Sequence, residues 1–337
     1  MAIQQLRLLQ AQDQGGGQAV KTRAGEVLAE PGGDYEALHR QLKQRFNARS
    51  GKEYGRFSED IGSHPFRGWL ADYLDGRLDF QAFSDRILSQ WQDEISRAEA
   101  EIDSPLLLVH ESLADGEVIY LFALEMDAVF QLDSALELHP AHSISLTRLN
   151  LAARIEVNDW RGDHGSANYL TLLQGRGTAE RGRCFARLAG FQREVDVDQE
   201  TRTFLEAVES YANQAGPEDA QKVRNRAYEF CNEQEALGEP VPLSALSGYI
   251  DDTEPERFAN HATREQAISP DSVLHPDRRK VRKLVRISGK GNGLSLSFSS
   301  DLVNQAVHYD RDRDALVITQ VPRSLKEQLQ SYLDQGE

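Results

Sequence analysis

The chain has 337 residues, of which 39% are apolar and 27% are charged. This composition is typical of a folded globular protein and excludes a chain that is disordered throughout. At roughly 100–200 residues per domain, the length predicts two domains or one large elaborated domain. No segment approaches the ~20 apolar residues that span a bilayer, and the first residues do not form a basic stretch followed by an apolar run. We therefore expect neither a membrane span nor an export signal.

The net charge is −16, but the positive charges are unevenly distributed. Seven Lys and Arg residues and no acidic residue lie between Arg278 and Lys290, and without these seven cations the rest of the chain carries −23. Such an acidic protein repels polyanions at long range. A local basic patch can still contact phosphates, because charges are screened beyond about 8–10 Å at physiological salt.

The two cysteines, Cys184 and Cys231, are too few for a disulfide framework or a cysteine-rich zinc site. Each has an aromatic neighbour, Phe185 or Phe230, which favours burial. Buried reduced thiols are typical of the cytoplasm, so we expect a cytoplasmic protein.

Residues 1–165 predict a domain in which helices and strands form separate groups. A β-hairpin is expected first, with strands at Ile3–Leu9 and Gln18–Thr22, and residues 50–63 resemble a loop. Three helices are expected in this domain. The first follows Asp34 as its N-cap, the second covers Pro65–Tyr73, and the third runs from Asp79 to about Ala100. The expected strands are Leu106–Ser112, Glu117–Ala123, Ala128–Leu132, Ser143–Asn150 and Ala152–Asn158, the last two as a pair. Because helices and strands do not alternate, we predict an α+β fold.

Residues 166–250 predict a helical region, because apolar residues recur at helical spacing from about Tyr169 to Ala245. Residues 251–337 predict a polar connector followed by a small β-rich portion. The expected strands of this portion are Lys283–Ser288, Leu294–Phe298, Val307–Tyr309 and Ala315–Thr319, followed by a terminal helix over Ser324–Leu333.

Six segments along the chain resemble, in the same order, the bacterial nucleoid-associated protein family of the NdpA type. They are Tyr54–Ser58, Tyr169–Arg176, Tyr228–Gln234, Gly289–Leu294, Asp314–Ile318 and Pro322–Leu329. The resemblance implies a cytoplasmic protein that is recovered with the nucleoid and binds DNA. The family supplies no settled catalytic site to carry over. This chain departs from the family in being more basic over Arg278–Arg286.

The basic segment is the first candidate for DNA contact. Its cations are Arg278, Arg279, Lys280, Arg282, Lys283, Arg286 and Lys290. Phosphate contacts supply most of the affinity that does not depend on base sequence, and each contact releases counterions. If Arg286 lies on a strand between Val285 and Ile287, its side chain points away from the core. The alternative is a basic strand edge whose charges only prevent pairing with other chains.

The loop Gly289-Lys290-Gly291-Asn292-Gly293 connects the expected strands Lys283–Ser288 and Leu294–Phe298. A plain hairpin turn explains its glycines, because positive φ angles are needed there. A phosphate contact by Lys290 is compatible with such a turn. The spacing is not that of a Walker A loop.

A second candidate group of arginines lies around Gly175 and Gly177. It comprises Arg176, Arg181, Arg183 and Arg187. Arg183 and Arg187 are four residues apart and would share one helix face. The alternative is an ordinary solvated helix face.

Catalytic and metal sites receive little support from the sequence. His139 and His142, and the neighbours Asp163 and His164, lack a ligand set of adequate number and spacing. The acids Asp115, Glu117 and Glu125 could suggest a metal-dependent nuclease, but acids are common at hairpin tips. We expect no enzyme, no metal and no cofactor.

We therefore predict a nucleoid-associated protein that binds double-stranded DNA with little sequence preference and is not bound to a membrane. A homodimer would double its phosphate contacts, and other nucleoid or DNA-topology proteins are further candidate partners. Two alternatives remain. The acidic bulk could make the chain a protein-interaction adaptor or a DNA mimic that acts on DNA-processing proteins, or the chain could be a metal-dependent nuclease.

Overall fold

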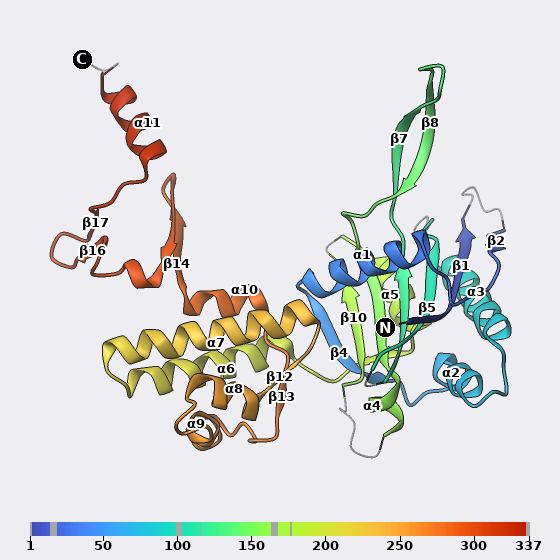
Figure 1. Cartoon of the computed structure of the whole chain (residues 1–337), viewed down its shortest axis with the longest axis horizontal. Coiled ribbons are helices and arrows are strands. Elements are labelled where there is room, and N and C mark those ends of the chain that lie inside the picture. Colours follow the sequence, from blue (N-terminus) through green and yellow to red (C-terminus); the bar gives the residue numbers. More distant parts are fainter. Residues whose placement is uncertain are drawn as a thin grey trace. The chain divides into compact units, whose positions relative to one another are not determined.

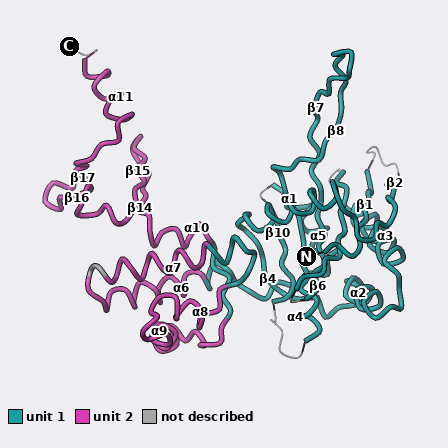
Figure 2. The backbone as a smooth tube through the Cα atoms, viewed as in Figure 1, with its two compact units in different colours: residues 1–200, 233–240, 273–277 teal, residues 201–232, 241–272, 278–337 magenta. Residues whose placement is uncertain are grey.

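The protein is described from a computed structural model, which covers residues 2–13, 19–98, 103–114, 116–162, 168–175 and 177–334. The chain forms two compact units, shown in different colours in Figure 2. Unit 1 comprises residues 1–200, 233–240 and 273–277, and unit 2 comprises residues 201–232, 241–272 and 278–337. The boundaries near residues 165 and 250 mark changes of local sequence pattern, and as domain boundaries they stay a prediction.

Unit 1 is built on a nine-stranded antiparallel sheet (Figure 1). The strand order is β11-β4-β10-β9-β6-β5-β1-β2, and β3 pairs with β1. The strands are β1 (Ala2–Gln12), β2 (Lys21–Ala24), β3 (Leu28–Ala29), β4 (Lys52–Phe57), β5 (Leu106–Ser112), β6 (Glu117–Ala123), β9 (Leu151–Glu156), β10 (Leu170–Gln174) and β11 (Phe191–Arg193). The helices are α1 (Asp34–Ala48), α2 (Phe66–Leu74), α3 (Phe80–Ser96), α4 (Val157–Arg161) and α5 (Ala179–Leu188). The α+β prediction is confirmed.

Side chains of the central strands alternate between two apolar cores. On β5, Leu106 and Leu108 belong to one core, which helices α2, α3 and α5 cover. Leu107 and Val109 belong to the other core, which α1 covers. Both faces of the central sheet are therefore buried, which explains why β5 and β6 are nearly continuous apolar runs.

Several elements of unit 1 follow the sequence predictions. Strands β5 and β6 have the predicted bounds, and Asp79 caps α3 by accepting a hydrogen bond from the Ala82 amide at 2.7 Å. The prediction for Asp34 was wrong by one residue, because Gly33 occupies the cap position with φ 62° and Asp34 is the first helical residue. The expected turn between the first two strands lies largely outside the described residues.

Other strands were missed or paired differently. Strand β4 lies within the expected loop 50–63, and β10 and β11 lie within the region expected to be helical. The expected pairing of Ser143–Asn150 with Ala152–Asn158 was wrong. Strand β8 (Leu138–Ile144) pairs with β7 (Met126–Leu132), whereas β9 joins the main sheet between β6 and β10.

Unit 2 contains a group of helices followed by two hairpins and a terminal helix. The helices are α6 (Val197–Asn213) and α7 (Pro217–Leu237), whose ends extend into unit 1, together with α8 (Leu243–Ile250), α9 (Arg257–Gln266), α10 (Arg278–Val281) and α11 (Arg323–Asp334). The remaining elements are β12 (Val241–Pro242), β13 (Val273–Leu274), which belongs to unit 1, the 3-10 turns η1 (Arg282–Leu284) and η2 (Ser300–Leu302), and the strands β14 (Arg286–Gly291), β15 (Leu294–Ser299), β16 (Val307–Asp310) and β17 (Ala315–Ile318). A bidentate ion pair joins α7 to α6, with Arg224 Nη2 2.8 Å and Nε 3.1 Å from the Glu209 carboxylate.

The close approach of β4 and β11 at Gly55 can be tested by substitution. A Cβ at this position would lie 2.0 Å from the carbonyl oxygen of Gln192 on β11. Neither backbone can move without breaking the ladder, so we expect Gly55→Ala to lower the free energy of unfolding by at least about 2–3 kcal/mol. Urea unfolding followed by circular dichroism measures the change.

Gly68 on α2 is the matched control. Nothing lies within 4 Å of a Cβ built there. Because alanine favours a helix over glycine, Gly68→Ala should be neutral or stabilising by up to about 1 kcal/mol. Equal effects of the two substitutions would contradict the close approach of β4 and β11.

Candidate nucleic-acid interface

The basic segment begins with two helical turns and not with the predicted strand. Residues Arg278–Val281 form α10 and Arg282–Leu284 form η1, so the strand starts only at Arg286. Val281 and Leu284 are buried at three-residue spacing and anchor these turns. Their burial leaves Arg282 and Lys283 on the exposed side. A basic strand edge therefore does not describe Arg278–Lys283.

The cations of the segment differ in how they are already engaged. Arg278, Arg279 and Lys280 each interact with other residues of the chain. Arg282, Lys283 and Lys290 are exposed, and none has a carboxylate within ion-pair distance in the described part of the chain. These three are thus the cations of the segment that an external anion can reach without displacing an internal partner.

Strands β14 and β15 form the predicted hairpin, but they are joined by a two-residue turn and not by the predicted loop Gly289–Gly293. Gly291 lies opposite Leu294, and the connecting Asn292 and Gly293 have φ angles of 49° and 76°. Two consecutive positive φ angles are typical of a type I′ turn, whose twist matches that of the strands. Of the three glycines of this segment, Gly293 lies in the turn with a positive φ angle, whereas Gly289, Gly291 and Lys290 belong to strand β14.

The hairpin has one polar face, which we call the donor face. Pairs that lie directly opposite place Arg286 with Ser299, Ser288 with Ser297, and Lys290 with Ser295. Directly opposite residues share a face of the ladder, and alternate residues along a strand share it too. The donor face therefore consists of Arg286, Ser288, Lys290, Ser295, Ser297 and Ser299.

Contacts and charge support this assignment. The Arg286 guanidinium lies 3.0 Å from Ser297 Oγ, across the strands on the donor face. No acidic residue occurs between Arg278 and Ser300. The opposite face carries Ile287, Leu296 and Phe298. Arginine, lysine and serine all donate hydrogen bonds to phosphate oxygens, so the donor face is chemically suited to a phosphate backbone.

The second arginine group belongs to unit 1 and is engaged in internal ion pairs. Arg181 Nη2 lies 2.6 Å from Glu125 Oε1, and Arg183 pairs with Glu180. Arg187 Nε lies 2.6 Å from Glu94 Oε2, whose side chain is only 3% exposed. Arg176 lies outside the described residues. For Arg183 and Arg187, a DNA contact stays a prediction, and it would compete with these pairs.

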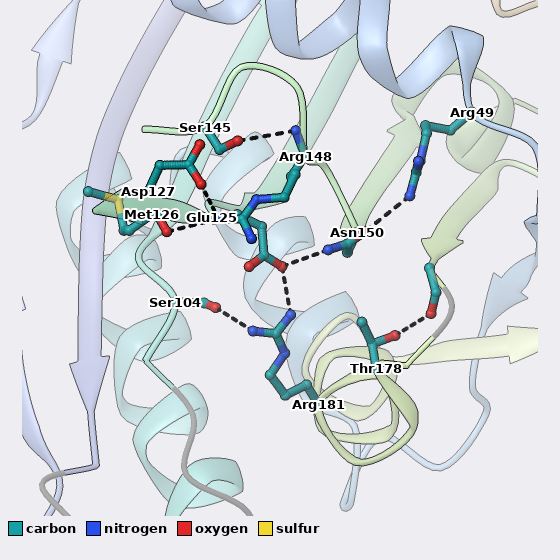
Figure 3. A network of polar contacts seen from close by, with 11 residues as sticks. Arg49, Ser104, Glu125, Met126, Asp127, Ser145, Arg148, Asn150, Thr178 and Arg181 are labelled. Carbon is teal, nitrogen blue, oxygen red and sulfur yellow. Dashed lines mark hydrogen bonds and ion pairs between the residues drawn. The ribbon is translucent and has the colours of Figure 1, made fainter. Parts of the chain in front are cut away.

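A polar network around Glu125 also bears on the nuclease alternative (Figure 3). Glu125 Oε1 accepts hydrogen bonds from Arg181 at 2.6 Å and from Asn150 Nδ2 at 3.0 Å. Glu117 is half exposed and lies 3.7 Å from His110 Nε2, and Asp115 lies outside the described residues. The Glu125 carboxylate is thus neutralised internally, which disfavours it as a metal ligand.

The predicted histidine candidates lie on the β7–β8 hairpin or outside the described residues. His139 has ligand atoms within 4.8 Å of those of Asp133 and Glu137, and all three are exposed. His142 lies opposite Ala128 on the neighbouring strand. Asp163 and His164 fall outside the described part. An exposed group of this kind is common without a metal, so the expectation of no metal site stays a prediction.

Sequence comparisons place the chain among known proteins. A family model described as nucleoid-associated protein YejK matches residues 6–326. The chain belongs to this family of nucleoid-associated proteins. A nucleoid-associated protein of Azotobacter vinelandii is 32% identical over 302 residues, which cover 89% of each chain. One of Pseudomonas paraeruginosa is 30% identical over 303 residues, which cover 88% of each chain. The resemblance stated from the six segments is confirmed.

The membrane prediction was examined on the helices of the structure. Among the described residues, no helix combines the length and the apolar character that crossing a bilayer requires. The longest helix, α7, contains several charged residues, such as Lys222, Arg224 and Arg226.

The ion pair of Arg187 with Glu94 yields a prediction. Removing this cation leaves the buried Glu94 carboxylate with the more distant and exposed Arg97, whose Nη1 lies 3.7 Å from Glu94 Oε1. Removing one partner of a fully buried pair typically costs about 3–5 kcal/mol. Because the Arg187 side chain is 42% exposed, we expect Arg187→Gln to lower the free energy of unfolding by about 2–3 kcal/mol. Chemical denaturation near neutral pH measures the loss.

Arg183→Gln is the matched control, since Arg183 is exposed and pairs with Glu180 on its own helix. An exposed pair of this kind contributes little to stability, so this variant should unfold like the parent chain. If both variants unfold like the parent chain, the ion pair of Arg187 with Glu94 does not stabilise the fold. The role of Arg187 would then have to be sought on the surface.

Proposed function

We propose that this protein associates with double-stranded DNA in the bacterial nucleoid, with little sequence preference, through the donor face of β14–β15 and the adjoining cations of η1. The observation that carries the proposal is the composition of that face. Arg286 and Lys290 lie on one strand with Ser295, Ser297 and Ser299 opposite, and no carboxylate belongs to either strand. Membership of the nucleoid-associated family supports the same function.

The chemistry of the face explains why little base preference is expected. Phosphate contacts position a protein on the duplex but carry no base information directly. A serine hydroxyl, an ammonium and a guanidinium can all donate to phosphate oxygens, whatever the neighbouring base. Arg282 and Lys283 extend the positive charge beyond the hairpin, and both are exposed. The Ser297 contact also orients the Arg286 side chain along the face.

The proposal contains no catalytic step and requires no cofactor. It locates the protein in the cytoplasm with the nucleoid, and two copies acting together would present two donor faces to DNA. Other nucleoid or DNA-topology proteins stay possible partners of such a complex. The acidic bulk of the chain limits attraction to DNA at long range, so binding should depend strongly on the local contacts.

A salt titration tests the proposal. Binding of a short random-sequence duplex is measured by fluorescence anisotropy between about 50 and 200 mM salt. Each phosphate contact that is lost should reduce the slope of log K against log salt by about 0.9. We expect Arg286→Gln with Lys290→Gln to reduce that slope by about 2 and to weaken binding at least about tenfold at the lowest salt. Arg282→Gln with Lys283→Gln should act alike.

The control is Lys21→Gln with Arg23→Gln, which removes two exposed cations from β2 in unit 1. This variant should bind like the parent chain. Unchanged affinity and slope in both donor-face variants, with intact circular dichroism, would refute the proposed contact. Absence of DNA binding by the parent chain at about 50 mM salt would instead favour the adaptor or DNA-mimic alternative.

A further inference from the structure

The hairpin of β7 and β8, which we call the arm (Met126–Ile144), lies outside both apolar cores of unit 1 except at its base, where Ile144 packs against the second core. In the described part of the chain, its strands pair with each other and with no other strand, from Met126 opposite Ile144 to Leu132 opposite Leu138. Figure 1 shows the arm extending well beyond the main sheet. A two-stranded ribbon is marginally stable in water unless one face is packed against something. The arm therefore has to be explained by what covers it.

The two faces of the arm differ in chemistry. Cross-strand pairs place Met126 with Ile144, Phe130 with Pro140, and Leu132 with Leu138 on one face. Ala128 and His142 complete this face, so seven of its eight side chains are apolar. The opposite face alternates with it and carries Asp127, Gln131, His139 and Ser143 around the apolar pair Val129 and Ala141. The arm is thus amphipathic, and we call its first face the apolar face.

The apolar face is exposed to an extent that is unusual for a folded protein. Phe130 is 78% exposed, Leu138 is 66% exposed and Leu132 is 58% exposed. Together with Met126, these side chains expose on the order of 400–500 Å² of apolar surface, as much as the largest patch of a typical monomer, and such patches are often functional.

The arm is held firmly at its base, which lies within unit 1 (Figure 3). The Ser145 amide donates to the Glu125 carbonyl at 2.8 Å, and Arg148 donates to the Met126 carbonyl at 3.0 Å and pairs with Asp127. The Glu125 side chain is in turn fixed by Arg181. A ribbon fixed in this way presents its face in a defined direction instead of folding back onto the sheet.

The tip of the arm adds a further exposed apolar side chain. Leu136 is 78% exposed and has φ 64°, a conformation that glycine or asparagine adopts at lower cost. Asp133 enforces the turn by accepting hydrogen bonds from the Ala135 and Glu137 amides. A leucine at this position adds a hydrophobic contact for a partner and contributes nothing to the isolated turn.

Charge and edge chemistry restrict the partner. The arm contains Asp127, Asp133 and Glu137 but no lysine or arginine, so it is unsuited to DNA or to an anionic membrane surface. Pro140 removes one backbone donor from β8, which disfavours the addition of a further strand at that edge. A partner is therefore expected to bind the arm through its apolar face. Such binding needs a partner surface that is equally apolar and uncharged.

We propose that the arm is the dimerisation element of this protein, and that the apolar faces of two arms pack against each other across a two-fold axis. An isologous contact requires one patch to be complementary to itself. The apolar face meets this requirement, because it carries no Asp, Glu, Lys or Arg, while Asp127 and Gln131 on the opposite face stay in solvent. Two such faces can bury up to roughly 800–1,000 Å² in total, which lies at the lower limit of the area of a specific interface.

The mass of the full chain in solution tests the proposal by analytical ultracentrifugation over a concentration series. The parent chain should be a dimer. Phe130→Glu with Leu138→Glu places charges in the centre of the interface and should weaken dimerisation at least about 100-fold. Gln131→Glu with Ser143→Glu adds the same charge to the opposite face and should leave the dimer intact. A monomeric parent chain would refute the proposal, and so would a charged apolar face that still dimerises.

Cross-linking distinguishes arm-to-arm contact from contact of an arm with another surface. A chain with Ala128→Cys on the apolar face should form a covalent dimer with a short bis-maleimide, and a chain with Ser143→Cys on the opposite face should not. The native Cys184 and Cys231 are buried, so the parent chain is the blank. If Phe130→Glu turns the dimer into a monomer but Ala128→Cys does not cross-link, the arm packs on another surface of the partner copy. That result would overturn the proposed packing.

This proposal is independent of the DNA proposal. The donor face belongs to unit 2 and the arm belongs to unit 1. Dimer-deficient arm variants should therefore keep the affinity of a single chain for a duplex too short to bind two copies. Donor-face variants should keep the parent mass.

Discussion

The requirement that both faces of the central sheet be covered governs unit 1. Alternate side chains of β5 enter two different cores, Leu106 on one side and Leu107 on the other. A sheet of this kind cannot leave one face in water, so helices must pack on both sides. Helix α3 supplies Phe83, Ile87 and Trp91 to the first core, and α1 supplies Leu42 and Phe46 to the second.

The same requirement explains the buried ion pairs of unit 1, because helices that pack on a sheet also bury some of their polar side chains. Glu94 on α3 is nearly inaccessible, and Arg187 on α5 neutralises it. On the other side, Glu111 of β5 lies 2.8 Å from Lys43 Nζ of α1. An arginine that balances a buried carboxylate costs several kcal/mol to remove. Arginines close together in sequence, such as Arg183 and Arg187, are thus weak evidence for a nucleic-acid surface.

The sequence predicted the elements whose pattern is local. Strands β5 and β6 are long apolar runs, and the Asn292-Gly293 turn has the residue types that a type I′ turn demands. Strands β4 and β10 were missed because each is short and its pairing is decided by partners far along the chain. The predicted strand started at Lys283, whereas the burial of Val281 and Leu284 at three-residue spacing makes Arg278–Leu284 helical and delays the strand to Arg286. The donor face could have been found, since Ser295, Ser297 and Ser299 alternate with apolar residues beside a turn of known register.

Several segments that carried the family resemblance have structural roles. Gly55 permits the close approach of β4 to β11, and the Tyr169 hydroxyl accepts a hydrogen bond from the Phe57 amide at 3.1 Å. A Cβ on Gly182 would lie 2.2 Å from Gln174 Nε2, so the glutamine of β10 and the glycine of α5 fit together. These residues position neighbouring strands and helices of unit 1 in this chain. They lie on the main sheet and helices of unit 1, whereas the donor face and the apolar face of the arm stand on separate hairpins. Function in this protein is therefore best sought on the two hairpins, whose side chains make few of the contacts that hold the cores together.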